Sequence, residues 1–533
     1  MKRLLIAALS ALAVCLHAAE EAAPERLNVV IFVADDMGWG DVGYHGSEIE
    51  TPNIDRLVRE GVELDRFYAF PICSPTRAAL LTGRSPLRFG ITGPLGWDAR
   101  NLPVDEHLLP QGFRAAGYQT FMVGKWHLGG GSDPDRLPHH RGFDHCYGCG
   151  GGVIDYYEHS NRTGRTDWHR NGEALEEKGY STDLLAAEAS RLLRERDRKK
   201  PVLLYVAFNA PHGPHQAPDE LVEKYRDLGR GRDVYAATVD AMDRAIGRVL
   251  STLDGEGLKK STLVVFFSDN GAPVRGGAAS NGTLRGGKGA TSEGGIRVPA
   301  VMRWPGVLEA GTKSRQVISV LDLFPTLAAA AGVAPGNRQP FDGRDVWPAI
   351  RAGKTVPREG LVISNGRSTA VFQGPWKLLH EGARGSRLYR IAEDPAEERD
   401  LAAEHPQLVG RLQVRAEMTV ALLPPADGPG GRRGNRFGRG RQGPLIHPLM
   451  VLLDTDRDRV ISAEEMARAV EVLRKLDANG DGRLTADELP RRGPGGRPGG
   501  RGGGRGAVER GAGTEEGGGR PERPRRPPRP AGE

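Results

Sequence analysis

The sequence has few cysteines and no long apolar segment beyond its N-terminus. Four cysteines occur among 533 residues, which excludes a small fold held together by disulfides. After residue 19, no stretch is long and apolar enough for a transmembrane helix. The formal net charge is only +6, and eleven arginines against five glutamates in 491–533 account for it. The chain body is therefore near neutral, and we expect no nucleic-acid partner.

The N-terminus has the pattern of a signal peptide. Lys2 and Arg3 precede an apolar run, 4–16, that is too short to cross a bilayer, and small residues follow it. We expect residues 1–19 to be removed and the protein to be exported, to the periplasm, the cell surface or the medium. A buried first strand or helix is the alternative. Cys15 leaves open a lipid anchor in a membrane.

Three nearly continuous apolar, β-branched runs predict strands that are buried on both faces. They are 27–34, 202–208 and 262–267, and helical patterns at 182–196 and 234–253 lie between them. Strands that alternate with helices indicate a doubly wound α/β domain. Sites in such sheets form at the carboxyl ends of the strands.

Polar residues follow each of the three runs directly. They are Asp35-Asp36, the segment 209–212, and Ser268-Asp269-Asn270. Since parallel strands end at one edge of a sheet, we expect these groups to line a shared cleft.

Composition and pattern divide the remaining chain. We expect an α/β catalytic domain over 26–355 and a small C-terminal α+β subdomain over 356–423, with strands at 361–364, 369–372, 376–379 and 388–391 and a helix near 406–420. A Gly/Arg-rich linker over 424–447, a compact helical segment over 448–490 and an Arg/Gly/Pro-rich disordered tail over 491–533 complete the chain. The tail is either a solvated end or attracted to an acidic polysaccharide or membrane.

One motif points to a specific chemistry. Cys73 begins C-S-P-T-R, and a short helical pattern and T-G-R follow. This block resembles the modification motif of the type I, formylglycine-dependent sulfatases of the alkaline phosphatase superfamily. The resemblance implies a large mixed, mostly parallel sheet flanked by helices. It also implies that a formylglycine-generating or equivalent sulfatase-maturating enzyme oxidises Cys73, whose hydrate then attacks sulfur. The alternative is a buried thiol beside a helix start.

The helix start suits an anionic sulfate ester, because its free N–H groups and dipole are positive. Arg77 lies about one turn after Cys73 and is a catalytic candidate beside it. The resemblance extends over residues 26–405, but the glycine-rich segment 148–152 carries no residue that identifies the substrate.

Two further segments resemble the metal-binding segments of the family. Asp35 and Asp36 open D-D-M-G-W-G-D, and Asp269 and Asn270 lie in S-D-N-G. All four are hard oxygen donors, which favour calcium or magnesium over zinc. The resemblance implies calcium, with the modified residue at position 73 as an additional ligand.

Three other matches supply the remaining catalytic candidates. In G-K-W-H, Lys125 is expected to bind sulfate and His127 to act as a base, both on one face if the segment is extended. In P-H-G-P, His212 is the candidate acid for the leaving alcohol, and Lys288 in G-G-K-G is expected to hold the sulfate and the leaving oxygen.

Two loops near the C-terminus resemble EF-hands and indicate a calcium-binding pair. The second, 477–488, fits at every oxygen position, with the candidate ligands Asp477, Asn479, Asp481, Arg483 (through its carbonyl) and Glu488. The first, 454–465, offers Asp454, Asp456, Asp458 and Glu465. It has Arg459 where glycine is expected, so we expect weaker calcium binding there, or none.

Cys146 and Cys149 form a C-x-x-C, which in an exported protein is either a local disulfide or two inert thiols. The sequence thus predicts a sulfuric ester hydrolase that is arylsulfatase-like and acts on a sulfated carbohydrate or another sulfate ester. Two alternatives stay open: a phosphonate or phosphodiester hydrolase of the same superfamily, and a calcium-dependent binding protein with an inactive enzyme domain.

Overall fold

The computed structural model describes residues 26–131, 133–229, 231–337 and 339–424, together with positions 471 and 474. The chain divides into two units, Met1–His447 and Pro448–Glu533, and the fold described below belongs to the first. The expected signal peptide, linker and tail lie outside the described residues, as do all the candidate EF-hand ligands. Among the described helices, none has the length and apolar character needed to cross a bilayer.

Five parallel strands form the centre of a ten-stranded sheet. In spatial order they are β9 (Thr262–Ser268), β1 (Asn28–Ala34), β8 (Val202–Ala207), β4 (Gln119–Gly124) and β5 (His145–Gly148). Every residue of β1, β8 and β9 is buried, as expected for strands covered on both faces. The three strands predicted from their apolar runs are therefore confirmed.

Further strands, in parallel and antiparallel pairs, extend both sides of this centre. Beyond β9 lie β10 (Ala300–Arg303), β2 (Val62–Leu64) and β11 (Thr312–Ser314), and beyond β5 lie β6 (His169–Arg170) and β7 (Glu173–Ala174). β3 (Phe67–Tyr68) and β12 (Ile318–Ser319) form a separate parallel pair. The large mixed sheet that the sequence implied is thus present.

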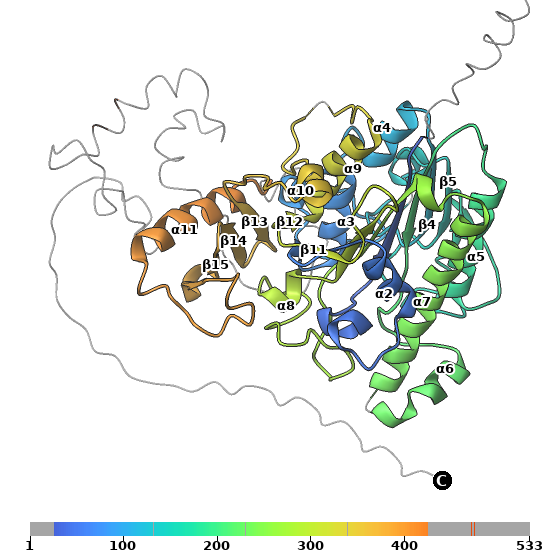
Figure 1. Ribbon diagram of the computed structural model, residues 1–533, viewed down its shortest axis with the longest axis horizontal. Coiled ribbons are helices and arrows are strands. Elements are labelled where there is room, and N and C mark those ends of the chain that lie inside the picture. The colour runs from blue at the N-terminus through green and yellow to red at the C-terminus, as the bar shows by residue number, and fades with distance from the viewer. Residues whose placement is uncertain are drawn as a thin grey trace, which may run out of the picture. The chain divides into compact units, whose positions relative to one another are not determined.

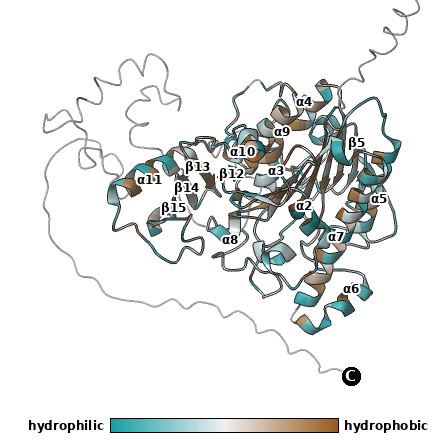
Figure 2. Cartoon of the chain, viewed as in Figure 1, coloured by the Kyte–Doolittle hydropathy of each residue, from teal (hydrophilic) through white to brown (hydrophobic). Residues whose placement is uncertain are grey.

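Helices cover the two faces of the sheet. Side chains alternate between the faces along each strand, so alternate residues of β1 lie in different cores. Val29, Ile31 and Val33 lie in one core, together with residues of α3 (Cys73–Thr82), α4 (Leu109–Ala115), α9 (Leu323–Ala331) and α10 (Trp347–Ala352). The other face packs against α2 (Pro52–Arg59), α5 (Ser181–Glu195), α6 (Asp219–Lys224) and α7 (Arg232–Gly255). Figure 1 shows these layers, and Figure 2 shows apolar strands inside amphipathic helices.

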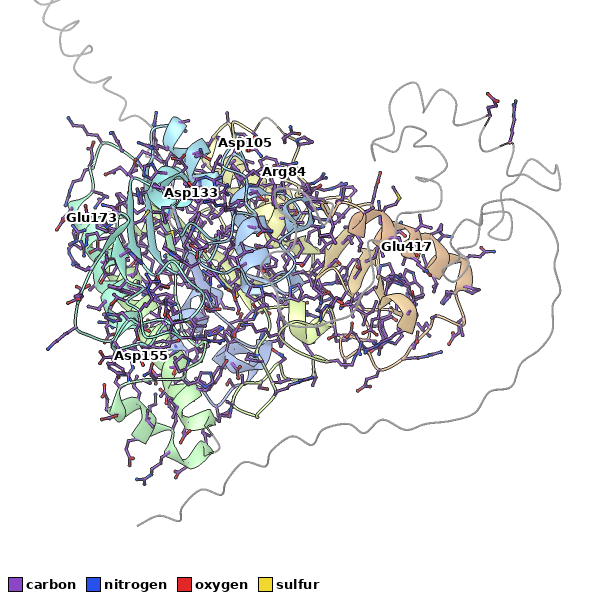
Figure 3. The ribbon with its side chains drawn as sticks, turned by 180° about the vertical axis from the view of Figure 1, so that it is seen from behind. Arg84, Asp105, Asp133, Asp155, Glu173 and Glu417 are labelled. Atoms are coloured by element: carbon purple, nitrogen blue, oxygen red, sulfur yellow. The ribbon has the colours of Figure 1, made fainter. Side chains whose placement is uncertain are left out.

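A four-stranded antiparallel sheet and one helix form the C-terminal part of this unit. The strands are β13 (Leu361–Ser364), β14 (Thr369–Gln373), β15 (Trp376–His380) and β16 (Ser386–Tyr389), in that order. α11 (Pro406–Val420) packs Leu412 and Ala416 against them. The helix bounds match the expectation, whereas 388–391 was wrong for the last strand, which begins two residues earlier. Seen from behind, Glu417 of α11 and Glu173 of β7 lie at opposite ends of the unit (Figure 3).

The end of β4 places the backbone of the expected sulfate-binding lysine. Gly124 has φ +112°, and a Cβ atom there would lie 1.9 Å from the carbonyl oxygen of Ala207. The next residue, Lys125, donates its N–H to that same carbonyl at 2.8 Å. Only glycine permits this close approach of two strands.

Gly124→Ala is expected to lower the free energy of unfolding by about 2–4 kcal/mol, because left-handed strain and a backbone clash add together. Urea denaturation measures the effect. Gly46→Ala is the matched control, since Gly46 also has positive φ (+87°) but has nothing within 4 Å of its would-be Cβ. It should cost only about 1 kcal/mol. Equal losses in the two variants would show that the contact with Ala207 is unimportant.

Candidate active site

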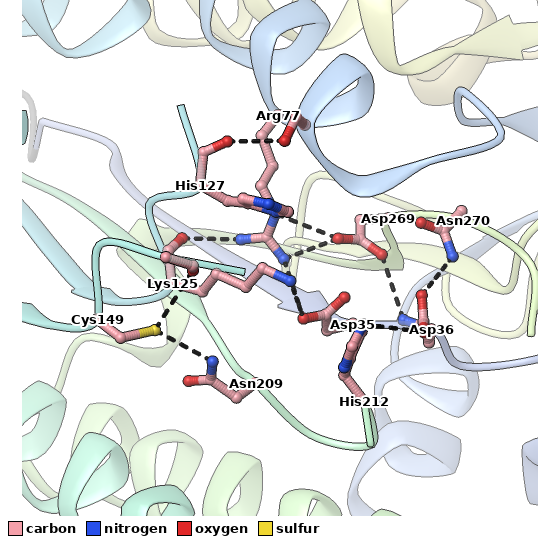
Figure 4. A network of polar contacts seen from close by, with 12 residues as sticks. Asp35, Asp36, Arg77, Lys125, His127, Cys149, Asn209, His212, Asp269 and Asn270 are labelled. Atoms are coloured by element: carbon pink, nitrogen blue, oxygen red, sulfur yellow. Dashed lines mark hydrogen bonds and ion pairs between the residues drawn. The ribbon is translucent and has the colours of Figure 1, made fainter. Parts of the chain in front are cut away.

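The polar residues that the sequence predicted to line a shared cleft lie together at the carboxyl ends of β1, β4, β8 and β9 (Figure 4). Backbone hydrogen bonds join the polar segments that follow these strands. The Asp269 N–H donates to the Ala34 carbonyl at 2.9 Å, and the Asp35 N–H donates to the Ala210 carbonyl at 3.0 Å. Residues that are distant in sequence are therefore fixed relative to one another by main-chain contacts.

Cys73 is the first residue of α3 and is buried. Its sulfur and carboxylate oxygens of Asp35 and Asp269 all lie within 4.8 Å of one another. Burial raises the pKa of the Cys73 thiol to about 11, so the unmodified side chain is a protonated and weak nucleophile. The Ser74 hydroxyl donates to the carbonyl of His127 at 2.9 Å, which joins the helix start to the G-K-W-H segment.

The acidic residues around Cys73 leave acceptor atoms without donors. Asp35 Oδ2 accepts from Lys125 Nζ at 2.5 Å, while Asp35 Oδ1 is buried without a hydrogen-bond partner. Asn270 Nδ2 donates to Asp36 Oδ1 at 2.7 Å, while Asn270 Oδ1 is likewise buried without a partner. Buried oxygens without donors are costly, and a hard cation satisfies them. The unpartnered oxygens of Asp35 and Asn270 thus fit a metal ion, and carboxylate oxygens of Asp36 and of Asp269 lie within 4.8 Å of Asp35.

The charges of the cluster support the same conclusion. Burial and the neighbouring charge of Asp35 raise the pKa of Asp269 above its usual range. Burial also disfavours the ionised form of Asp35, but Lys125, His212 and Arg77 outweigh it and hold that pKa below its usual range. A bound cation favours ionisation of all the carboxylates that surround it.

Arg77 is fully engaged with its neighbours. Its Nε and Nη2 donate to Asp269 Oδ2 at 3.2 and 2.8 Å, and its Nη1 donates to the Lys125 carbonyl at 2.8 Å. These bonds orient one metal-ligand candidate and one sulfate-binding candidate. The sequence did not predict this positioning role, and the catalytic role of Arg77 stays a prediction.

Lys288 reaches the cluster from a loop. Its Nζ lies 2.7 Å from Asp36 Oδ2, and the N–H of Gly289 donates to the Pro71 carbonyl at 2.7 Å. The loop therefore lies against the segment that leads into Cys73. Lys288 is part-buried, whereas Lys125 is wholly buried.

His127 does not have the extended backbone that the sequence suggested. Its φ is +54°, in the left-handed region, and its N–H donates to the carbonyl of Gly150 at 3.1 Å. A turn, rather than strand alternation, directs the side chain. Burial, with the charges of Lys125 and Arg77, holds the pKa of His127 well below its usual range. The ring is therefore neutral and able to accept a proton.

His212 lies next to the carboxylate of Asp36. Its Nδ1 is 2.7 Å from the Gly213 carbonyl, which fixes that nitrogen as the donor. Its Nε2 lies 3.5 Å from Asp36 Oδ2. Burial lowers the pKa of His212, while Asp35 and Asp36 oppose the shift. Nε2 is consequently the atom free to exchange a proton with a ligand.

Two residues next to the active site, Asp167 and Asn209, belong to none of the sequence motifs. Asp167 is buried and accepts the N–H groups of Gly150 and Gly151 at 2.9 and 2.8 Å, and so shapes the loop that binds His127. Nothing in the sequence marked it. Asn209 is buried with Oδ1 unpartnered, and its place directly after β8 was the available signal.

Cys146 and Cys149 are free and buried. Burial raises the pKa of Cys149 to about 12 and that of Cys146 further. Of the two alternatives, the structure favours inert thiols.

Comparison with known proteins identifies the family. The family model described as Sulfatase matches residues 27–333. This chain belongs to the sulfatase family. N-acetylgalactosamine-6-sulfatase of Rattus norvegicus is 38% identical over 384 residues, 67% of this chain and 71% of that protein. Arylsulfatase J of Mus musculus is 37% identical over 346 residues, 63% of this chain, and the chain covers only 57% of its length. The prediction of a sulfatase enzyme is confirmed.

Solved structures agree with this assignment. The crystal structure of Ps i-CgsB has a TM-score of 0.71 and 33% identity, covering 75% of this chain and 94% of its own. The phosphonate monoester hydrolase of Agrobacterium radiobacter is 22% identical with a TM-score of 0.53, which shows a shared fold alone.

A divalent cation is expected to raise the thermal unfolding midpoint, because it satisfies the unpartnered oxygens of Asp35 and Asn270. At a hundredfold excess over Kd the gain is about 2.7 kcal/mol, and calorimetric scans with calcium, magnesium or zinc measure it. Asn270→Ala should abolish the gain, whereas Glu488→Gln, which alters only the expected EF-hand loop, should retain it. The opposite result for the two variants would place the stabilising ion elsewhere.

Proposed function

We propose that the protein hydrolyses sulfate monoesters of a sulfated carbohydrate, with a formylglycine at position 73 as nucleophile and calcium as the metal. The single observation that supports this most strongly is the position of the Cys73 sulfur within 4.8 Å of two buried carboxylates. Membership of the sulfatase family supports the reaction. The substrate class rests on a relative named as an N-acetylgalactosamine-6-sulfatase and on the crystal structure titled Ps i-CgsB in complex with k-i-k-neocarrahexaose.

The proposed metal ligands are Asp35, Asp36, Asp269 and Asn270, with an oxygen of the modified residue 73. Their hard oxygen donors suit calcium. When bound, the ion supplies positive charge that stabilises the anionic transition state.

The formylglycine hydrate supplies an oxygen nucleophile and a second hydroxyl through which sulfate is later expelled. Lys125 and Lys288 are placed to neutralise sulfate oxygens, and Arg77 holds Asp269 and the Lys125 backbone in position. His212 Nε2 donates a proton to the leaving alcohol, helped by the negative charge of the ester, which favours the imidazolium. His127, neutral through burial, accepts a proton from the remaining hydroxyl as sulfate departs.

Mass spectrometry of the peptide that contains residue 73 tests the nucleophile. Protein from its native host should show a loss of about 18 Da relative to cysteine, because sulfur is replaced by oxygen and two hydrogens are lost. An unmodified thiol in such protein would leave the calcium-dependent binding protein as the better hypothesis.

Kinetics with paired aryl esters test the reaction. Aryl sulfate should be hydrolysed faster than aryl phosphate, and Cys73→Ala should reduce sulfate hydrolysis by at least about 10³-fold, since the variant lacks the residue that forms the covalent intermediate. Ser85→Ala, a buried residue near the far end of α3, is the matched control and should retain activity. Faster phosphoester cleavage would favour the phosphonate or phosphodiester hydrolase.

We also propose that loop 477–488 binds calcium as an EF-hand, with a weaker or empty partner at 454–465, and that the protein is exported after removal of residues 1–19. The ligand pattern of the second loop and the short apolar run of the N-terminus support these proposals. Asp477→Ala should remove one calcium ion per chain in equilibrium dialysis, and exported protein should begin after residue 19. Unchanged stoichiometry, or an intact N-terminus, would contradict the respective proposal.

A further inference from the structure

A second concave region lies at the edge strand β11. It has a volume of about 740 Å³. Its lining includes Val62 of β2, Arg66 shortly after that strand, β11 and the residues that follow it, the end of α10 with the segment after it, and the end of β14. We name it the β11 cleft. All its walls belong to the first unit of the chain.

The β11 cleft is strongly cationic. Among the described residues that line it, the basic ones are Arg66, Lys313, Arg315, Arg351, Lys354 and Arg358, whereas Glu309 is the one carboxylate. Within the described part of the chain, Lys313 pairs with Glu63 and Arg358 with Asp322, but no ion pair involves the other four. Four unneutralised cations around one hollow attract a ligand with several negative charges.

Arg66 adds an unneutralised charge to the wall of the cleft. Its Nε and Nη2 atoms are buried and have no hydrogen-bond partner among the described residues. Because these two atoms are shielded from solvent, Arg66 acts on a ligand in the cleft through its charge rather than through a direct hydrogen bond from them. Gln316 fixes the neighbouring wall, because its side chain donates to the carbonyl of Val356 at 3.0 Å and accepts the Val356 N–H at 3.2 Å.

The topology puts the cleft and the active site at one edge of the sheet. β10 is antiparallel to both β9 and β2, so β2 runs in the direction of β9, and β11 is parallel to β2. Arg66 follows the carboxyl end of β2, and Arg315 follows the carboxyl end of β11. Asp269 follows the carboxyl end of β9, so all three lie at the same ends of the strands. Three interstrand spacings, about 14 Å, separate β9 from β11.

We infer that the β11 cleft binds anionic groups of the sulfated carbohydrate chain at positions remote from the ester that is cleaved. This inference rests on the proposed function, because the ligand is the same substrate chain. Sulfate groups match the unpaired guanidinium and ammonium groups, and the lateral separation is within reach of a short oligosaccharide. The cleft thus selects polymeric over small sulfate esters.

The first test compares two substrates in a charge-removal variant. Arg315→Ala combined with Lys354→Ala removes two exposed cations. The KM for sulfated hexasaccharides from carrageenan or chondroitin sulfate should rise about five- to tenfold with kcat little changed. The kcat and KM of this variant for aryl sulfate should stay within about twofold of the wild-type values, since this ester does not reach the cleft.

The matched control is Lys199→Ala combined with Lys200→Ala, two exposed lysines just before β8 at the opposite edge of the sheet. It removes the same charge and should leave the hexasaccharide KM unchanged. An equal rise in both variants would mean general electrostatic attraction and would overturn the inference, as would no rise in the cleft variant.

Binding measured without turnover separates the cleft from the reaction. In a Cys73→Ala background, titration calorimetry should show weaker binding of a sulfated hexasaccharide to the cleft variant and to Arg66→Gln than to Cys73→Ala alone. Desulfated hexasaccharide should bind none of them measurably. If the wild type cleaves no sulfate ester but these binding differences hold, the proposed function fails and the cleft stands. Equal binding of the sulfated hexasaccharide by all variants would overturn the inference about the β11 cleft. So would inorganic sulfate that competes for the cleft as well as the hexasaccharide does at the same concentration.

Discussion

The structure depends on a balance of buried charge at one edge of the sheet. Asp35, Asp36 and Asp269 are opposed by Arg77, Lys125 and Lys288, and most of these side chains are almost completely buried. Removing one partner of such a pair costs about 3–5 kcal/mol, because the other charge is left uncompensated. The pocket is close to neutral when all six groups are charged. A divalent cation would leave it with excess positive charge, which is what an anionic ester requires.

The strand order of the sheet brings these charged groups together. Strands β1, β8, β9 and β4 are parallel, so the residues that follow them meet at one edge. Close backbone approaches then fix the lysine and the histidine of G-K-W-H: Gly124 lies against Ala207, and His127 adopts a left-handed turn bonded to Gly150. Precise placement comes from main-chain contacts and glycine, so the long side chains need little freedom to reach their partners.

The sequence predicted the elements with strong local patterns. Buried strands such as 27–34 consist of apolar, β-branched residues, and α11 has clear helical periodicity, so both were found. β4, with its mixed sequence Q-T-F-M-V-G, was missed, because its burial comes from neighbours that are distant in the chain. The motif residues around Cys73 lie together, as expected, whereas the EF-hand motifs lie outside the described residues. The engagement of Arg77 with Asp269, the turn at His127 and the support from Asp167 were not predicted, because each depends on tertiary contacts that no local pattern encodes.

Residue 73 and the four oxygen ligands are proposed to share one cation. A crystal structure of natively produced protein with bound calcium, with anomalous scattering used to locate the ion, tests it most directly. We expect one ion in contact with Asp35, Asp36, Asp269 and Asn270 and an oxygen, not sulfur, on residue 73. An intact thiol at that position with the ion bound only elsewhere in the chain would contradict it.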